Sequence, residues 1–469
     1  MREIEIAVVG SGIGGTLISA LWRDKGLVLF EKEPNLGGCA STFTRYGHRF
    51  NAGATTFAGY EKGHVLKKIC DLIGFKPDII ESDIAFRVLQ KGAIIDRSND
   101  FESFLENINT QFPHPNNRIF WENMRALDAA FWNLEEIYFN KYSIRAYWKS
   151  FVCVLRLIKT FKSALFKSAK SYMEEVLHGI SDAYKEFIDA QLLITLQTTH
   201  HAIPLLSMAL GLSYPFHTVF YAKGGMGSLI KEALNGVEVH VDEEVLNIQK
   251  HKEYFILQTV KAHYKAKKVI LNTSVYESAM LFEDKRIKDY YQRFVFSDQS
   301  AFVVYLHVES DEVPLHHYQV ILEKPISHTV SNAFFVSFSD KDDTKLGENG
   351  YSVTLSTHTK ASLWEGFSKE AYQSRKSELE SILRVAFAKE FPHVSIERSF
   401  SATSKTFKRY IGRSNCGGGP LRFNTLFQTP SCSTPFKNLY NAGDTVFAGQ
   451  GWPGIALGVN VLHDALTQD

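Results

Sequence analysis

Three glycines near the start of the chain have the spacing of a dinucleotide-binding turn. Gly10, Gly12 and Gly15 directly follow the apolar run of residues 4–9 and form the pattern GxGxxG. In this pattern the first glycine permits a tight turn, the second lets the backbone approach a pyrophosphate, and the third lets a helix pack closely on the strand. N–H groups at the start of that helix would bind phosphate oxygens. The other turn residues expected at the ligand are Ser11, Ile13 and Gly14.

An acidic residue follows at the position of a ribose contact. Residues 16–25 are predicted to form a helix and residues 27–30 a second strand, after which comes Glu31, about twenty residues beyond the first glycine. A carboxylate there accepts hydrogen bonds from ribose hydroxyls, whereas a 2′-phosphate needs an arginine, so we do not expect NADP. This order of elements predicts a βαβ dinucleotide site, with Lys32 beside the ligand. The alternative is a glycine-rich turn that binds nothing.

A second glycine-rich turn lies near the other end of the chain. A predicted strand ends in Gly443-Asp444, and a predicted helix over residues 455–465 follows the letters Gly-Trp-Pro-Gly. A strand again delivers glycines to a helix N-terminus, where the helix dipole favours an anion. We expect Gly443, Asp444, Gly454 and Ile455 to close the same site, because a ligand as large as a dinucleotide needs contacts on both sides. The alternative is a capping loop after an edge strand.

The segment after the second predicted strand extends the dinucleotide motif. The paired glycines Gly37 and Gly38, with Thr42 soon after, resemble the FAD-binding signature of enzymes of the glutathione reductase and amine oxidase type. Simple NAD dehydrogenases do not usually carry this extension. Further along, Gly53 matches the glycine that lies beside the flavin in those enzymes.

Other stretches resemble the same enzymes. Residues 221–229 resemble the GGxGxL element of that superfamily, and residues 407–413 with 417–420 resemble a segment of carotenoid isomerases and retinol saturases. Taken together, the chain resembles the phytoene desaturase, carotenoid isomerase and retinol saturase group of FAD flavoproteins. The similarity is strong over residues 4–60 and 405–465.

The resemblance implies a non-covalently bound FAD. In these enzymes the aspartate of the second glycine turn, here Asp444, contacts the ribityl-phosphate part of FAD. The other residues implied to bind the cofactor are Gly37, Gly38, Thr42, Gly53, Ala54, Thr55 and Val245. Thr56, Gln450 and Trp452 are implied to border the flavin ring and the substrate. Cys416 precedes three glycines, but its surroundings do not match a covalent attachment motif, so we expect an unlinked flavin.

The implied activity is that of an FAD-dependent oxidoreductase acting on an apolar isoprenoid or carotenoid-like lipid. Flavin N5 takes or gives a hydride, so desaturation, saturation and isomerisation all stay open. No Ser/His/Asp arrangement or carboxylate pair lies near the motifs, and no catalytic side chain is assigned. Only one GxGxxG is present, so a quinone or oxygen is the expected electron acceptor. The alternatives are a flavin amine oxidase and a non-catalytic lipid-binding protein on the same fold.

The positions of the motifs predict an α/β protein, α+β overall, with two parts. Residues 1–80, 215–275 and 405–469 would form a Rossmann-like FAD-binding domain of the glutathione reductase/amine oxidase type. Residues 81–214 and 276–404 would form an inserted substrate domain of sheet and helices over the flavin. The first of these two pieces is mostly helical in pattern.

A basic and aromatic stretch within residues 139–170 lies outside the cofactor motifs. No acidic residue occurs between Glu136 and Glu174, whereas eight lysines and arginines do. On a helix, one face would carry Trp148, Phe151, Leu155, Ile158 and Leu165. This pattern is typical of a helix in a membrane interface, where each cation near an anionic surface contributes about 1 kcal/mol. The alternative is a solvated basic helix whose apolar face packs on an ordinary core.

Composition narrows the function classes. Lys and Arg number 52 and Asp and Glu 51, a formal net charge of +1, which argues against a nucleic-acid binder. The five cysteines include no CxxC and no Cys/His cluster of zinc spacing, so we expect a reducing compartment and no metal site. No signal peptide and no spanning helix are expected. The expected location is the cytoplasm, with peripheral contact at the inner face of the membrane.

Overall fold

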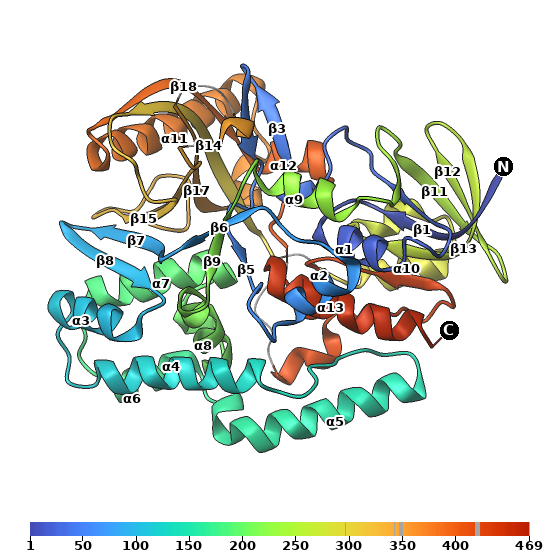
Figure 1. Ribbon diagram of the computed structural model, residues 1–469, viewed down its shortest axis with the longest axis horizontal. Helices are drawn as coiled ribbons and strands as arrows, with labels where there is room; N and C mark the ends of the chain where they lie inside the picture. Colours follow the sequence, from blue (N-terminus) through green and yellow to red (C-terminus); the bar gives the residue numbers. More distant parts are fainter. Residues whose placement is uncertain (296, 342, 347–349, 418–422, 469) are drawn as a thin grey trace.

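The computed structural model describes residues 1–295, 297–341, 343–346, 350–417 and 423–468. Two seven-stranded sheets organise these residues, and two smaller sheets accompany them. In Figure 1 the first large sheet, which contains β1 and β13, lies on the right, and the second, which contains β14 and β17, lies at the upper left. This arrangement confirms the predicted α/β class with a second part built of sheet and helices.

The first sheet has the strand order β10-β2-β1-β13-β12-β11, with β19 paired to the end of β13. Its strands are β1 (Arg2–Val9), β2 (Leu27–Phe30), β10 (Glu238–His240), β11 (Val245–Lys250), β12 (Phe255–Thr259), β13 (His263–Leu271) and β19 (Leu439–Asn441). β12 pairs antiparallel with both β11 and β13, whereas all other pairs in this sheet are parallel. Residues 6–9 of β1 are all buried, as in parallel strands that are covered on both faces.

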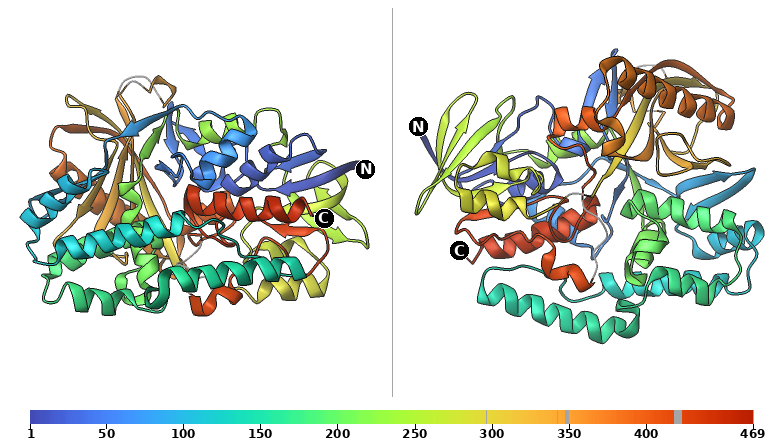
Figure 2. Two further views of the ribbon diagram at one scale, coloured as in Figure 1. Left: turned by 60° about the horizontal axis from the view of Figure 1, so that its bottom comes forward. Right: turned by 180° about the vertical axis from the view of Figure 1, so that it is seen from behind.

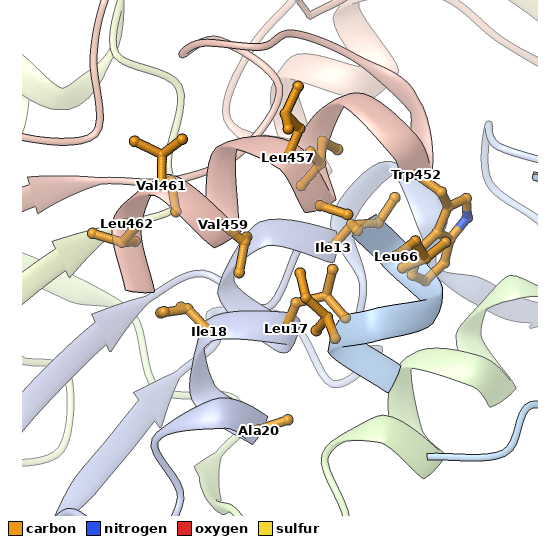
Figure 3. Packing of buried hydrophobic residues seen from close by; sticks show 14 of the residues in the cluster. Ile13, Leu17, Ile18, Ala20, Leu66, Trp452, Leu457, Val459, Val461 and Leu462 are labelled. Carbon is orange, nitrogen blue, oxygen red and sulfur yellow. The ribbon is translucent and has the colours of Figure 1, made fainter. Parts of the chain in front are cut away.

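Three helices cover one face of the first sheet. α1 (Ile13–Leu21) packs against α13 (Gly451–Leu466), and α2 (Val65–Ile73) contacts both. Figure 3 shows Ile13 and Leu17 of α1 in one buried cluster with side chains of α2 and α13. The apolar face of α13 therefore fastens the last strand and helix onto the first βα unit.

Helix α10 packs on the opposite face of the first sheet, although it lies beyond the predicted domain boundary at residue 275. Ala7 and Val28 of the sheet share a core with Ile287 and Tyr291 of α10 (Lys285–Gln292). Residues 278–292 therefore pack with the dinucleotide sheet, although the sequence prediction placed residues 276–404 in the other part. The short helix α10 has few apolar residues, and they are buried against the first sheet. Its local sequence does not indicate which of the two sheets it packs on.

The second sheet has the strand order β18-β14-β17-β16-β15-β7-β8. Its strands are β7 (Ile84–Gln90), β8 (Ala93–Ser98), β14 (Gln299–Ser310), β15 (His317–Ile321), β16 (Ala333–Phe338), β17 (Tyr351–Lys360) and β18 (Val394–Ala402). Neighbours are antiparallel except for β15 and β7. Side chains alternate between the faces: Phe334 packs toward α11 (Lys369–Glu390), and Phe335 packs toward the helices of the other face.

A helical layer covers that other face. Its helices are α3 (Phe101–Gln111), α4 (Asn117–Trp132), α6 (Ala169–Val176), α7 (Asp182–Leu196) and α8 (Leu205–Ser213). Asp100, Ser168 and Ser181 each accept a backbone N–H in the first turn of the helix that follows, which fixes where α3, α6 and α7 begin. This layer confirms the mostly helical pattern of residues 81–214.

Short elements connect the two sheets. They are β3 (Thr42–Arg45), β4 (His48–Asn51), β5 (Phe57–Ala58), β6 (Ile79–Ser82), β9 (Val219–Ala222), α9 (Met226–Ala233) and α12 (Ser404–Ile411). β3 pairs with β4, and β9 pairs with both β5 and β6. Apart from the last two residues of β6, all strands of these small sheets come from the predicted cofactor part.

Helix α5 (Ile144–Phe161) lies along the outer edge of the molecule in Figures 1 and 2. It buries mainly small residues, Ala146, Ser150 and Cys153, together with Phe161. Its large apolar residues face outward, namely Ile144, Tyr147, Trp148, Phe151, Leu155 and Ile158. The predicted common face of Trp148, Phe151, Leu155 and Ile158 is confirmed. The assignment of Leu165 to this face is wrong, because Leu165 lies beyond α5 and is buried.

Two further observations concern this region. Residues 137–139 and Cys153 belong to the core of the first sheet, so this part of the predicted substrate domain packs on the cofactor half. None of the helices in the described part of the chain combines the length and apolar composition that crossing a bilayer requires.

The core of the first sheet gives a stability prediction. Leu17 of α1 is fully buried, whereas Leu72 of α2 is 70% exposed. Leu17→Ala should destabilise the protein by about 2–5 kcal/mol, because it opens a cavity against α13. Leu72→Ala, the matched control, should change stability by less than about 0.5 kcal/mol. Thermal unfolding checks both, and equal midpoints for the two variants would contradict the described packing.

Candidate functional site

The glycine turn after β1 is closed by backbone contacts. Gly10 has a φ of +98°, a conformation that glycine adopts readily and other residues rarely do. A Cβ on Gly15 would lie 2.1 Å from the carbonyl oxygen of Gly10, so the first turn of α1 rests directly on the turn. A Cβ on Gly14 would lie 2.6 Å from the backbone nitrogen of Gly443. The two glycine turns that the sequence predicted separately are therefore in contact.

The N-terminus of α1 is suited to bind an anion. Its N-cap residue is Gly12, which offers no side chain to accept the first N–H groups, and the first turn contains no acidic residue. The positive end of the helix dipole and these N–H groups face the same cleft as the turn. This arrangement fits the diphosphate of a dinucleotide.

Glu31 directly follows β2, at the sequence position of a ribose contact in the motif. Its Oε2 accepts hydrogen bonds from the backbone N–H of Ser11 at 2.9 Å and from the Ser11 hydroxyl, and its Oε1 accepts one from Glu33 N–H at 3.0 Å. Ser11 Oγ also accepts the N–H of Gly37 at 2.9 Å. A carboxylate oxygen can accept two hydrogen bonds, so Oε1 retains capacity for a ribose hydroxyl.

A second carboxylate lies at the same end of the cleft. Burial alone would raise the pKa of Glu243, but hydrogen bonds from Thr259 and Tyr264 lower that pKa below its ordinary value. Glu243 therefore stays ionised beside Glu31. Two carboxylates at this end disfavour the extra phosphate of NADP.

Asn272 is hydrogen-bonded to the first glycine turn and packs against the second, where a Cβ on Gly443 would lie 2.9 Å from its Oδ1. It follows β13, and its backbone N–H donates to the carbonyl of Val9 at 2.9 Å. Its side-chain Nδ2 donates to the carbonyl of Gly10 at 3.2 Å. Sequence reasoning assigned Asn272 no role. Its position at the carboxyl end of a parallel strand, where ligands of open α/β sheets bind, is the signal that would have indicated one.

Asp444 forms a buried ion pair with Arg413. The guanidinium donates to both carboxylate oxygens, at 2.8 Å from Nη1 and 2.5 Å from Nη2. Burial alone would lower the pKa of Arg413, but the charge of Asp444 raises it above its ordinary value, so the guanidinium stays protonated. Both residues line the cleft beside Gly443. Asp444 thus lines the cleft with a cationic partner that the motif did not indicate.

These residues surround one cleft of about 330 Å³ at the carboxyl edge of the first sheet. The predicted site residues on its walls are Gly10, Ser11, Gly12, Ile13, Gly14, Glu31, Lys32, Gly37, Gly38, Val245, Gly443, Asp444 and Ile455. Residues from distant parts of the sequence complete it, among them Cys39, Glu243, Asn272, Met280 and Arg413. The structure therefore unites both glycine turns in one site.

Predicted residues of the first motif after Gly38 lie beside the cleft rather than on its walls. Thr42 donates to Asn51 at 3.0 Å and accepts the N–H of Gly227 at 2.9 Å, so it fastens the start of α9. Ala54 donates its N–H to the carbonyl of Cys39 at 3.0 Å, which places residues 53 and 54 against a wall residue. The hydroxyl of Thr55 accepts a hydrogen bond from Ser337 of the second sheet at 2.8 Å.

The remaining predicted residues, Thr56, Gly15 and Gly454, also lie outside the cleft walls. Thr56 directly precedes β5 and is half-buried. Gly15 lies beneath the turn, and a Cβ on Gly454, in the first turn of α13, would contact the carbonyl oxygen of Gly449 at 3.2 Å. The GGxG stretch of residues 224–227 does not reach the cleft either, because Asn51 and Thr42 accept its N–H groups.

Gln450 and Trp452, which were predicted to border a flavin, do not line the described cleft. Gln450 is hydrogen-bonded to Gln197, and its Nε2 donates to the carbonyl of Thr195 at 2.5 Å, so it ties α13 to the end of α7. Trp452 is 3% exposed and packs edge-on against Phe57 at a centroid distance of 5.0 Å. Figure 3 shows its ring beside Leu66 in the helical core. Trp452 lies within the glycine-rich motif, but burial of its large apolar ring in the core is favourable and directs the side chain there.

The segment before the last motif is partly described. Residues 404–411 form α12, and Tyr410 and Gly412 line the cleft with Arg413. Of the glycine-rich stretch at 417–420, only Gly417 is within the described residues. Its carbonyl accepts a hydrogen bond from Gln197 at 2.9 Å.

Comparison with known proteins defines the class. A family model described as flavin containing amine oxidoreductase matches residues 25–455. The chain belongs to this family and is a flavin-dependent oxidoreductase. The match begins after the GxGxxG turn, so the geometry of that turn is separate evidence for the cofactor site.

Individual relatives are consistent with the predicted resemblance. The chain is 24% identical over 506 residues to a protein of Daucus carota named prolycopene isomerase, chloroplastic, with 98% of this chain and 80% of that protein covered. It is 23% identical to the carotenoid 3,4-desaturase of Haloarcula japonica, with 99% and 98% covered. A solved oxidoreductase from Methanosarcina mazei has the same fold, with a TM-score of 0.66 and 18% identity over 98% of this chain and 100% of that one.

The residues present fit a flavin cofactor that contains a diphosphate. The uncapped start of α1 and the Arg413 guanidinium supply positive potential, while the glycines leave space for close approach of the backbone. Glu31 offers an acceptor at the other end. When bound, a flavin supplies hydride transfer, and the residues of the cleft bind and orient it.

The Arg413–Asp444 pair gives a prediction about flavin binding. Arg413→Met leaves the Asp444 carboxylate without its partner, and breaking a buried pair costs about 3–5 kcal/mol. We expect a lower unfolding midpoint and at least tenfold weaker flavin binding, measured by quenching of flavin fluorescence. Arg409→Met on the exposed side of α12 is the matched control and should match wild type. Unchanged flavin affinity in Arg413→Met would contradict a role at the cofactor.

Proposed function

We propose that the chain binds FAD non-covalently and uses it to oxidise, reduce or isomerise an apolar carotenoid-like or other isoprenoid lipid. The observation that carries this proposal is one cleft in which the two glycine turns, Glu31 and the Arg413–Asp444 pair lie together. The relatives that align over nearly the whole chain, with names that refer to prolycopene and to a carotenoid, support the substrate class.

The distribution of charge along the cleft supports FAD. Its diphosphate would lie at the start of α1, its adenosine ribose near Glu31, and its ribityl chain toward Asp444. Burial raises the pKa of the Cys416 thiol to about 12, so this thiol stays protonated and is a poor nucleophile. That supports a flavin without a covalent link at Cys416.

The absorbance spectrum of the purified protein tests the cofactor. We expect flavin bands, complete release of the flavin when the protein is precipitated with acid, and FAD by mass spectrometry of the supernatant. Flavin that stays with the precipitated chain would contradict non-covalent binding. A colourless protein that FAD cannot reconstitute, but that retains bound lipid, would contradict the enzyme and favour a lipid-binding protein on the same fold.

The compound that reduces the flavin distinguishes the proposed reaction from amine oxidation. Desaturation moves a hydride and a proton from the lipid, so the flavin must afterwards pass two electrons to an acceptor, for which we propose a quinone or oxygen. Isomerisation returns the hydride and needs no net acceptor. Anaerobic mixing with a carotenoid in detergent should bleach the flavin or change the polyene spectrum. Bleaching by amines alone, with peroxide formed in air, would favour an amine oxidase.

The exposed face of α5 supports peripheral membrane contact, as proposed for an enzyme whose substrate dissolves in bilayers. Trp148 is 65% and Phe151 is 50% exposed, although both are aromatic. Phe427, packed near Phe139 at the start of this region, is 63% exposed. A continuous apolar stripe of this kind marks an interaction surface. We propose that it lies in the interface of the inner face of the membrane.

The electrostatic contribution is smaller than the composition suggested. Five of the eight cations form ion pairs within the fold: Arg145, Lys149, Arg156, Lys167 and Lys170. Lys141 is buried and donates to the carbonyl of Thr429 at 2.8 Å. Apolar insertion should therefore dominate membrane binding, and anionic lipid should matter little.

Vesicle sedimentation tests this surface. The double variant Trp148→Ser with Phe151→Ser removes two side chains that each contribute about 1.5–3 kcal/mol when fully buried, so vesicle binding should fall at least tenfold. Val385→Ser on α11 removes an apolar side chain that is 69% exposed elsewhere and serves as control. Equal binding of all three proteins, or a change in oligomeric state instead of vesicle binding, would contradict a membrane role for α5.

A further inference from the structure

Three side chains outside the cofactor cleft converge where the two halves of the molecule meet. Glu61 and His64 lie at the start of α2, which packs in the core of the first sheet. His217 lies two residues before β9, at the end of the helical layer. One ligand atom from each of these three residues lies within 4.8 Å of those of the other two.

The orientation of His217 is fixed by a fourth residue. Its Nε2 is hydrogen-bonded to Oδ2 of Asp128 at 2.6 Å, and Oδ1 of Asp128 accepts the indole N–H of Trp132 at 3.2 Å. When Nε2 carries the proton for this bond, the lone pair of Nδ1 points away from Asp128. Nδ1 lies 4.0 Å from Oε1 of Glu61. A carboxylate that orients a histidine in this way is the usual second contact of a metal-bound imidazole.

Glu61 and His64 each have a buried atom without a hydrogen-bond partner among the described residues. These atoms are Oε2 of Glu61 and Nδ1 of His64. Oε1 of Glu61 accepts the backbone N–H of Thr218, so one carboxylate oxygen is fixed and the other is available. An unsatisfied buried polar atom is unfavourable in a folded protein, and both residues belong to the cluster that includes His217.

We propose that Glu61, His64 and His217 bind one divalent transition-metal ion such as Zn²⁺, with Asp128 orienting His217. Two imidazole nitrogens and one carboxylate oxygen are ligands that Zn²⁺ and its first-row neighbours prefer. Bonds of about 2.0–2.1 Å place tetrahedral ligand atoms about 3.3 Å apart, so small side-chain rotations suffice to close the cluster. The sequence predicted no metal site, because His217 lies far along the chain from Glu61 and His64, and the three residues lack local zinc spacing.

The position of the cluster indicates a structural role for the ion. Glu61 follows Gly59, whose Cβ position would lie 2.7 Å from the ring of Pro453 in the first turn of α13. His217 and Asp128 belong to the layer that covers the second sheet. The bound ion would link the layer over the second sheet to the helices beside the cofactor cleft.

Metal analysis of the purified protein tests this site. After removal of bound metal with a chelator, wild-type protein dialysed against Zn²⁺ should retain one ion per chain and unfold at a higher temperature. Glu61→Gln keeps an oxygen for the N–H of Thr218 but loses the charge, so it should fold and bind Zn²⁺ at least tenfold more weakly. Asp128→Asn should weaken binding about 10–100-fold while leaving all three ligands in place.

Controls separate this site from other histidines and from the flavin. His251→Ala changes an exposed histidine and should retain the ion. Flavin absorbance, measured in the same samples, should not change with Zn²⁺, so failure of the metal proposal is distinguishable from failure of the cofactor proposal. Zn²⁺ binding that survives in Glu61→Gln and in the double variant His64→Ala with His217→Ala would overturn the assignment. Absence of micromolar Zn²⁺ binding to wild-type protein would overturn it too, leaving Asp128 and His217 as a hydrogen-bonded pair beside Glu61.

Discussion

The cofactor cleft depends on how closely backbone segments approach one another at the carboxyl edge of the first sheet. The first turn of α1 rests on the carbonyl of Gly10, and the second glycine turn touches the backbone at Gly14, with no space for a Cβ at either contact. Asn272 lies between the turns, hydrogen-bonded to Val9 and Gly10 of the first and packed against Gly443 of the second. Five parallel strands bring these segments to one edge of the sheet. The close approach of their backbones there therefore determines both the position of α13 and the shape of the cleft.

Charge adds a second level of organisation to this edge. One end of the cleft is lined by Glu31 and Glu243, whereas the middle combines the N-terminus of α1 with Arg413. A ligand with hydroxyl groups at one end and a diphosphate in the middle matches this gradient. The family assignment, which rests on residues 25–455, and the cleft geometry, which begins at Gly10, lead to the same class of protein by separate routes.

Local patterns predicted the parts of the fold that local interactions determine. The βαβ unit, both glycine turns, Glu31 and Asp444 have short-range signals, and the structure places them at one cleft. The partners of those residues come from other segments. Arg413 finds Asp444 across 31 positions, and the sequence gives no sign that Trp452 faces the helical core instead of the cleft. The orientation of α5 also depends on which face its neighbours leave uncovered, and α10 joins the first sheet through only a few apolar contacts.

The three-segment composition of the first sheet has a consequence for synthesis on the ribosome. Domains begin to fold as the chain emerges, so the GxGxxG turn is made early. Its opposite wall, Gly443 with Asp444 and Ile455, emerges only after both halves of the second sheet. The nascent chain therefore carries an open phosphate-binding turn through almost all of translation, and cofactor capture coincides with docking of β19 and α13. Flavin content thus reports on completion of the whole fold, and a chain truncated before β19 would remain colourless however well its first βαβ unit forms.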